Sequence, residues 1–328
     1  MQADSIRFTA DEANALAIRG LTQIGYGSAE SEIVAAHLVD AELMGYPALG
    51  LSRILTIAEH PLFKQPRRPV TITHETPVSA RVDGGNHVGM YAIRRAAEIA
   101  IDKANASGFA LVGAHNTFLS GRNAYYLDMI ARAGFAGIHT ACSPPVVAPL
   151  GGSRPAFGTN PIAFGLPRQP HPVIIDIATS AANFGDLMLA ARLGQDLPAG
   201  VAIDAAGKPT RDPVAALAGA ILPFGGHKGS GIAFAVQALG LLGGTAMTRG
   251  EVRDFGFLFV VFDPGLLMSV ADYQRQIETL IAEVKATPCQ SGVGEVRIPS
   301  ERAYAELERR VAEGIDVPNA IVKKIENL

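Results

Sequence analysis

Four short apolar segments, separated by stretches with helical periodicity, constrain the fold of this chain more than any other feature. The segments read FALVGA, FAGIHTA, PVIIDIA and FGFLFVVFD. Strands that are apolar at nearly every position are expected where both faces of a sheet are covered by other elements. The sequence therefore predicts an α/β fold in which helices flank a largely buried sheet.

The composition narrows the class of protein further. Hydrophobic residues make up 48% of the 328 residues and charged residues 18%, which favours a large core over disorder. The net charge of −3 indicates neither nucleic acid nor a membrane surface as a partner. We see no secretory signal and no membrane span. The two cysteines, Cys142 and Cys289, form no disulfide framework, so we expect a cytoplasmic protein.

The two ends of the chain differ from its middle. TADEANALAIRGLTQIG begins with Thr9 and Glu12 at capping-box spacing, and a second helix follows with Ser28 as its candidate cap. SERAYAELERRVAEG and PNAIVKKIENL are amphipathic helices near the C-terminus. We expect a helical N-terminal part over residues 1–75 that packs against residues 300–328. Residues 76–299 then form the α/β domain.

The loop ILPFGGHKGSGIAF has the residues of an anion site. Gly225, Gly226 and Gly229 allow close approach of the backbone to a ligand, and Lys228 adds a positive charge. A helix predicted from about Ser230 adds free N–H groups and a positive dipole end. The loop matches neither a Walker A motif nor a G-x-G-x-x-G fingerprint. It suits a phosphate or a carboxylate, and the alternative is a glycine-rich turn with a solvated lysine.

Four motifs in order resemble one enzyme family. They are PLGGSRPAFGTNPIAFGLP, DIATSAANFGD, LPAGVAIDAAGKPTRDP with the glycine loop, and SGVGEVRIPSERAY. In this order and at these separations they resemble the type-2 malate/lactate dehydrogenases, a family that also contains sulfolactate dehydrogenases and Δ1-pyrroline-2-carboxylate/Δ1-piperideine-2-carboxylate reductases. The resemblance implies a non-Rossmann nicotinamide-binding fold with a mixed sheet and helices. It also implies NAD or NADP as cofactor, a small carboxylate substrate and a homodimer.

The resemblance carries roles to particular residues of this chain. Thr159 and Asn160 are expected to contact substrate. Asp186 stands where many relatives carry lysine, and a carboxylate there can select among nicotinamides or merely cap a helix. The remaining residues implied to lie along the cofactor are Asp176, Ala178, Thr179, Ser180, His227, Lys228 and Gly229.

The substrate motif of the family, D-S-H-G-x-x-R, appears here as YPALGLSRI. Its arginine is Arg53, which can grip a carboxylate through two parallel hydrogen bonds. The alternative is an ion pair on a helix surface. The serine and histidine are replaced by Ala48 and Leu49, so a usual acid/base imidazole is missing. Tyr46 is one candidate to supply the proton instead.

A second family histidine is also replaced. In GAHNTFLSGRNAYY an ungapped alignment places Thr117 at that position, and we count it among the catalytic-site residues. If the strand continues, His115 and Thr117 share one face, because side chains alternate. His115 is therefore the preferred proton donor, and the alternative is a structural histidine bonded to backbone. Ser120 and Tyr125 are further candidates.

The loss of both imidazoles bears on the substrate. Reduction of a ketone needs a proton delivered to oxygen, whereas an iminium already carries its proton at moderate pH. The sequence therefore favours a cyclic 2-imino acid or a relocated acid. The competing hypothesis is a dinucleotide-binding paralogue that has lost catalysis. We expect no metal site, because ligand-spaced clusters such as HExxH are missing, and no G-x-S-x-G hydrolase elbow.

Overall fold

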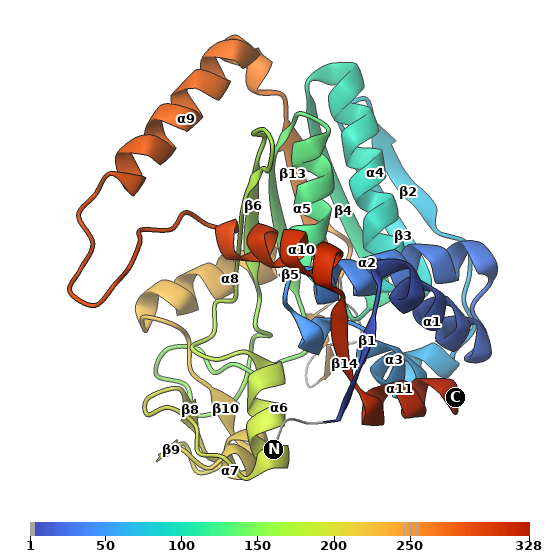
Figure 1. The fold of residues 1–328 in the computed structure, drawn as a ribbon. Coiled ribbons are helices and arrows are strands. Elements are labelled where there is room, and N and C mark those ends of the chain that lie inside the picture. The colour runs from blue at the N-terminus through green and yellow to red at the C-terminus, as the bar shows by residue number, and fades with distance from the viewer. Residues whose placement is uncertain (1–3, 246, 249–250, 253–254) are drawn as a thin grey trace.

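A seven-stranded mixed sheet forms the centre of the molecule (Figure 1). The computed structural model describes residues 4–245, 247–248, 251–252 and 255–328. The strand order is β2-β3-β4-β13-β5-β6-β7, with β3 parallel to β4 and the other neighbouring pairs antiparallel. The strands are β2 (Thr71–Thr76), β3 (Ser79–Val88), β4 (Phe109–Phe118), β5 (Ala136–Cys142), β6 (Ile162–Leu166), β7 (Val173–Ile177) and β13 (Gly256–Phe262). The predicted mixed sheet is confirmed.

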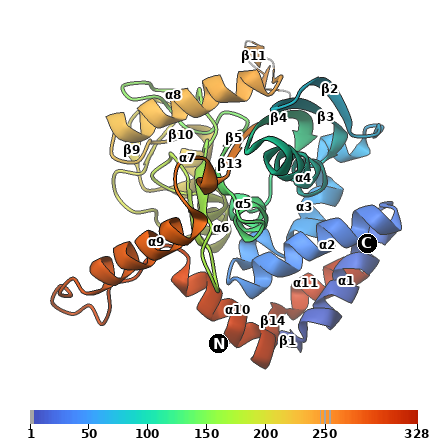
Figure 2. The ribbon, with the colours of Figure 1, turned by 90° about the horizontal axis from the view of Figure 1, so that it is seen from above.

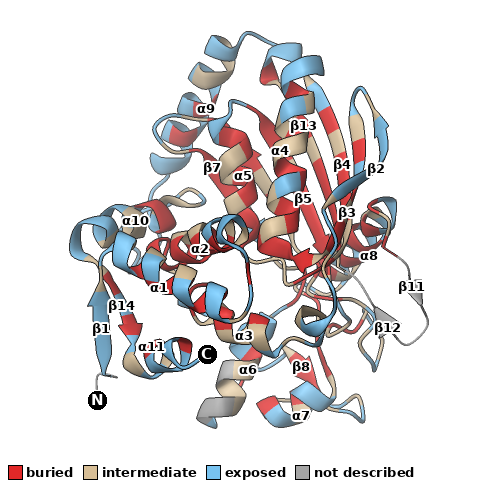
Figure 3. Ribbon diagram, turned by 90° about the vertical axis from the view of Figure 1, so that its right-hand side faces the viewer, coloured by how far each residue is buried: buried red, intermediate tan, exposed pale blue. Residues whose placement is uncertain are grey.

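Helices cover both faces of this sheet, which explains why strands such as β5 and β13 are apolar at nearly every position, whereas the edge strand β2 is polar and exposed. Helices α4 (Gly89–Ser107) and α5 (Asn123–Arg132) lie on one face, and α8 (His227–Leu242) lies on the other (Figure 2). The end of α8 packs closely, because a Cβ added at Gly113 of β4 would lie 2.6 Å from Gly243 Cα. The sheet is the most continuous buried layer of the molecule (Figure 3).

The N-terminal part is helical, as predicted, up to Lys64. The capping box of the first helix is confirmed, since Glu12 N donates to Thr9 Oγ1 and Thr9 N donates to the Glu12 carboxylate. The predicted cap Ser28 is wrong: Gly27 is the N-cap, and Glu30 accepts from its N–H group. The elements are α1 (Ala10–Gln23), α2 (Ser28–Leu43), η1 (Pro47–Leu49), α3 (Arg53–Glu59) and η2 (Pro61–Lys64).

The two ends of the chain meet through a pair of strands that the sequence analysis did not find. Strand β1 (Ser5–Phe8) pairs antiparallel with β14 (Ile315–Pro318), between the C-terminal helices α10 (Glu301–Glu313) and α11 (Asn319–Glu326). Both C-terminal helices match the predicted segments. Side chains of β14 and α11 share one hydrophobic core with α1 and α2. The domain boundary near residue 75 stays a prediction.

A smaller lobe lies below the main sheet in Figure 1 and carries the three-stranded sheet β10-β8-β9. Its core joins residues from α6, α7 and the neighbouring strands. Helix α9 projects away from the body in the same view, and most of its residues are exposed. The remaining elements are α6 (Phe184–Leu193), β8 (Ala202–Ile203), β9 (Pro209–Thr210), α7 (Pro213–Ala218), β10 (Ala220–Ile221), β11 (Met247–Thr248), β12 (Glu251–Val252), η3 (Pro264–Leu266) and α9 (Val270–Lys285).

Candidate active site

The glycine-rich loop opens helix α8 and presents unpaired backbone N–H groups. The helix begins at His227, earlier than the predicted Ser230. Gly225 and Gly226 have φ values of 53° and 61°, a region that favours glycine. Within the described residues, the consecutive amides from Gly225 to His227 have no hydrogen-bond acceptor. Such a concave run of amides beside the exposed Lys228 suits an anionic group.

Gly229 holds the DIATS segment against this loop. A Cβ added at Gly229 would lie 2.5 Å from Thr179 O and 2.6 Å from Phe224 O, so only glycine fits without a backbone shift. Phe224 N donates to Thr179 O at 3.0 Å. Ser180 forms a β-bridge with Pro223 next to this contact. Two segments that the family resemblance assigns to the cofactor are therefore side by side.

Thr159 and Asn160 join the same cluster. Thr179 donates to Thr159 O through both its backbone N and its hydroxyl, each at 2.9 Å. The buried Asn160 donates from Nδ2 to Ala233 O on α8 at 3.0 Å. Asn160 Oδ1 and Ser180 Oγ are buried without a hydrogen-bond partner in the described structure. Ser180 lies next to Pro223, at the start of the glycine loop, and its unsatisfied hydroxyl fits a polar dinucleotide. The substrate contacts of Thr159 and Asn160 stay predictions.

The two predicted cofactor carboxylates have partners within the protein. Asp176 accepts from Ala124 N at 3.0 Å, in the first turn of α5. Asp186 is exposed in the first turn of α6 and accepts from Asn183 Nδ2 at 2.9 Å. This contact joins two side chains, and no described backbone N–H group of the helix start donates to the Asp186 carboxylate. Its role toward the cofactor, and those of Asp176 and Ala178, stay predictions.

Arg53 is a half-buried cation at the start of α3. In the parts of the chain that the structure describes, its guanidinium has neither a hydrogen-bond acceptor nor an acidic partner. Burial lowers its pKa below the usual range of an arginine. The predicted alternative, a surface ion pair, therefore finds no support. A desolvated guanidinium with five free donors is suited to a bidentate carboxylate.

Unusual backbone conformations gather at the ends of β3 and β4. Asn116 and Leu119 have φ values of 54° and 56° on either side of Thr117, and Asn86 has 63° at the end of β3. Asparagine tolerates this region, but a leucine there is uncommon and costs free energy. Such residues concentrate at functional sites. We therefore include the turn after β4 in the candidate site.

The contacts of His115 and Thr117 differ from what side-chain alternation predicts. The positive φ of Asn116 interrupts the alternation between them. His115 Nδ1 lies 2.9 Å from Gly243 O at the far end of α8, which makes Nδ1 the protonated nitrogen. Helical rise places this end roughly 22 Å from Lys228. Thr117 donates its hydroxyl to His87 O at 2.5 Å. Their catalytic roles stay predictions, and these contacts favour structural roles.

Other polar residues of the turn after β4 are used to hold it in place. Arg122 forms a buried ion pair with Asp40 of α2, and its backbone N donates to His37 Nε2 at 2.8 Å. Burial lowers the pKa of His37 to about 3, so the ring stays neutral and can accept. Tyr46 is partly exposed, and its ring lies 5.8 Å from the Arg122 guanidinium carbon. Tyr46 as proton donor stays a prediction.

The sequence analysis missed His60. Its ring stacks on Phe118 at a centroid distance of 4.6 Å, next to Thr117. Its Nδ1 accepts from Leu62 N at 3.2 Å, so the neutral ring carries its proton on Nε2. Burial lowers its pKa. His60 is the C-cap of α3, the helix that begins at Arg53, and this closeness in the sequence is the signal that relates it to the site.

The sequence analysis also missed Glu42, a buried carboxyl at the end of α2. Its Oε1 accepts from Leu51 N at 2.9 Å, and burial raises its pKa to about 7. Between about pH 4.5 and about pH 7, the Glu42 carboxyl is therefore largely protonated in the folded protein but ionised in the unfolded chain, where its pKa is near 4.5. The free energy of unfolding therefore decreases as the pH rises from about 4.5 to about 7. Above about pH 7 the contribution of Glu42 no longer changes with pH.

Replacing Glu42 by glutamine should remove this loss of stability, because an amide does not titrate. We expect the free energy of unfolding of Glu42→Gln, relative to the unmodified protein, to rise between about pH 5 and about pH 7 and then level off. Urea unfolding at several pH values measures it. A difference that is constant across this range would contradict the raised pKa.

Comparison with known proteins supports one family over nearly the whole chain. The model of the family described as "Malate/L-lactate dehydrogenase" matches residues 8–326. An L-sulfolactate dehydrogenase of Methanothermobacter thermautotrophicus is 37% identical, over 93% of this chain and 91% of that protein. A Delta(1)-pyrroline-2-carboxylate/Delta(1)-piperideine-2-carboxylate reductase of Pseudomonas aeruginosa is 32% identical, over 98% of each. The sulfolactate dehydrogenase structure from Methanocaldococcus jannaschii aligns with a TM-score of 0.86 and 29% identity, over 98% and 97% of the two chains.

These matches, with a fold and an anion site that suit a dinucleotide, define the protein as an NAD(P)-dependent oxidoreductase. The chain belongs to the malate/L-lactate dehydrogenase family. None of the helices among the described residues is long and apolar enough to cross a membrane. The same residues contain no group of three or more His, Cys, Asp or Glu side chains placed to hold a metal ion.

Proposed function

We propose that this oxidoreductase transfers hydride between NAD(P)H and the α-carbon of a small 2-oxo acid or cyclic 2-imino acid. The observation that carries the substrate class is Arg53, a half-buried guanidinium with no anionic partner in the described structure. A substrate carboxylate would supply the missing anion and would fix the adjacent carbon in place. The relatives named above, which act on sulfolactate and on cyclic imino carboxylates, support this class.

The cofactor would be held at the start of α8. The amides from Gly225 to His227 and the Lys228 ammonium would bind the phosphates, and Ser180 would meet a polar group of the cofactor nearby. When bound, the nicotinamide supplies or accepts the hydride. We assign no preference between NAD and NADP, since Asp186 is exposed and bonded to Asn183.

A substrate screen tests the proposal directly. Pyruvate, oxaloacetate, sulfolactate, Δ1-pyrroline-2-carboxylate and Δ1-piperideine-2-carboxylate would each be supplied with the matching redox form of NAD and NADP. The absorbance of reduced nicotinamide reports turnover. Binding of the dinucleotide without turnover of any acid would instead support the competing hypothesis of a paralogue that has lost catalysis, which no comparison favours.

Lys228→Ala should weaken binding of NADH and NADPH by roughly 5- to 150-fold, as loss of a charge-assisted contact with phosphate predicts. Calorimetry with each nucleotide measures this change. Lys208→Ala is the matched control, because it removes the same charge at a residue outside the glycine loop, in the turn between β8 and β9. Equal affinity of Lys228→Ala and the unmodified protein would remove Lys228 from the site.

We propose further that the protein is a cytoplasmic homodimer. Both cysteines are free of disulfides, as in a reducing compartment. The outer face of α8 exposes Phe234, Leu241 and Leu242, and Phe234 is 68% exposed. Such a contiguous apolar helix face favours association with another surface, and we assign it to a second copy of the chain.

Phe234→Glu should convert the dimer to a monomer, because it would place two symmetry-related charges in an apolar contact. Light scattering coupled to size-exclusion chromatography at micromolar concentrations measures the mass. Val311→Glu on α10 makes the same change at another exposed apolar position and should leave the dimer intact. An unmodified protein that is monomeric in this experiment would refute the proposal.

A further inference from the structure

We propose that Glu42 is a positioning residue that holds the loop from Tyr46 to Arg53 and thereby presents Arg53 to the substrate carboxylate. The inference rests on the proposed function, because it assumes that Arg53 binds that carboxylate. It gives Glu42 a role toward the substrate site in addition to its effect on stability.

The Glu42 side chain is packed directly under the loop. Glu42 is 3% exposed, and its Oε1 accepts from Leu51 N at 2.9 Å. A Cβ added at Gly50 would lie 2.2 Å from Oε1 and 2.4 Å from Cδ of Glu42. The φ of Gly50 is −93°, so no left-handed conformation is involved, and the missing Cβ leaves the space that the Glu42 carboxyl occupies. The carboxyl and the glycine therefore fit each other as a pair.

This contact fixes the turn that begins α3. Leu51 lies two residues before Arg53, and Arg53 N donates to Gly50 O at 2.9 Å. Ile54 N then donates to Leu51 O at 3.1 Å. Gly50 and Leu51 are thus both hydrogen-bonded to the first turn of α3. A displacement of Leu51 would be passed directly to the backbone of Arg53.

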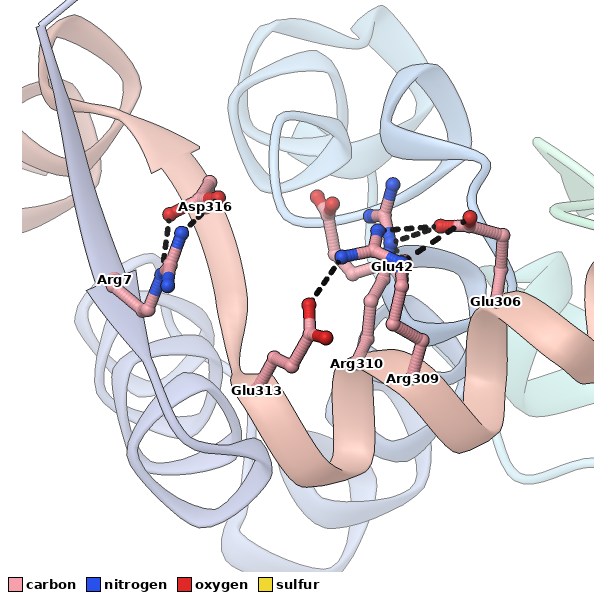
Figure 4. Close-up of polar contacts among 7 residues, drawn as sticks. All are labelled: Arg7, Glu42, Glu306, Arg309, Arg310, Glu313 and Asp316. Atoms are coloured by element: carbon pink, nitrogen blue, oxygen red, sulfur yellow. Dashed lines mark hydrogen bonds and ion pairs between the residues drawn. The ribbon is translucent and has the colours of Figure 1, made fainter.

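The backbone of Glu42 is itself held by the C-terminal helix α10. Arg310 Nη1 donates to Glu42 O at 2.8 Å, and Arg310 Nε is paired with Glu306 at 2.9 Å (Figure 4). Arg310 is the cation that faces Glu42 from α10, and Glu306 partly offsets it. The last turn of α2 is therefore anchored, which makes the Glu42 side chain a fixed support for the loop.

Burial leaves much of the Glu42 carboxyl neutral near neutral pH, since it raises the pKa to about 7. Glutamine has the same length and keeps a carbonyl oxygen that can accept from Leu51 N. Glu42→Gln should therefore retain the support, whereas Glu42→Ala removes the acceptor and leaves Leu51 N buried and unpaired. The two variants separate the hydrogen bond from the charge.

The experiment compares Glu42→Ala, Glu42→Gln and the exposed control Glu59→Ala. First, hydrogen exchange of the Leu51 amide is measured by NMR without substrate. We expect faster exchange in Glu42→Ala by tenfold or more, and near-normal exchange in the other two. Second, steady-state kinetics should show a KM for the acid raised roughly tenfold in Glu42→Ala, as loss of one buried hydrogen bond predicts. The KM for the nucleotide should not change.

The outcomes distinguish this inference from the proposed function. If no acid of the screen is turned over, the proposed function fails, and the Leu51 exchange rate still tests the support of the loop. Equal exchange of Leu51 in Glu42→Ala and the unmodified protein would overturn the inference. So would an acid KM that changes no more than the nucleotide KM. If Glu42→Ala does not fold, Glu42→Gln decides, because a raised acid KM in that variant contradicts the hydrogen-bond role.

Discussion

Arg53→Lys should lower kcat/KM for the acid substrate by roughly a hundredfold or more, because one ammonium cannot reproduce two parallel hydrogen bonds to a carboxylate. The Arg53 guanidinium is already desolvated in the folded protein, and no acidic group of the described structure pairs with it. The substrate carboxylate would therefore be its anionic partner, and the substitution weakens that contact directly. The α-carbon would then no longer be fixed relative to the nicotinamide, and kcat should fall together with substrate affinity.

Steady-state kinetics with the best acid from the screen measures this effect, and calorimetry with NADH and NADPH serves as its internal reference. Cofactor affinity should be nearly unchanged, because Arg53 has no hydrogen bond to the cluster around the start of α8. Arg68→Lys is the matched control, since the Arg68 side chain is largely exposed and lies 3.5 Å from Asp83. Full kcat/KM in Arg53→Lys would assign Arg53 a structural role instead.

Imine reduction should exceed ketone reduction by roughly 10²- to 10⁴-fold in kcat/KM, the range that general acid catalysis contributes. Leu49 cannot titrate, and the Thr117 hydroxyl is bonded to His87 O. A ketone needs a proton at oxygen as hydride arrives, whereas an iminium brings its own. The comparison uses Δ1-pyrroline-2-carboxylate and pyruvate between about pH 5 and about pH 9.

Two single substitutions test the source of any proton in this reaction. His115→Ala changes the histidine that the sequence favours, and His60→Ala changes the one that the structure adds beside Phe118. An unchanged pH profile in His115→Ala would exclude His115 as donor. Ketone turnover equal to or faster than imine turnover would show that an acid is present, and the hypothesis of an imine substrate would then be wrong.

Much of the fold follows from local patterns in this sequence. Four strands of the central sheet, β4, β5, β7 and β13, correspond to the four apolar segments, and Gly108 ends α4 with a φ of 75°, as a glycine after a helix predicts. The strands β1 and β14 could not be predicted in the same way. Each has four residues, and they pair across more than 300 positions, so neither has a pattern of its own.

The sequence by itself determined many of the elements and the glycine loop at the start of α8, and it singled out Arg53 as the arginine predicted to bind a carboxylate, because each of these features is recorded in residue types at short spacing. Only the tertiary structure decided which polar groups remain free. Thr117 is occupied by His87 O, His115 faces Gly243 O, and Glu42 supports Leu51 N. Each of these hydrogen bonds joins residues that are not neighbours in the sequence, and the pKa of Glu42 is raised by its burial in the folded protein. No local pattern contains that information, because it depends on which elements the fold brings together.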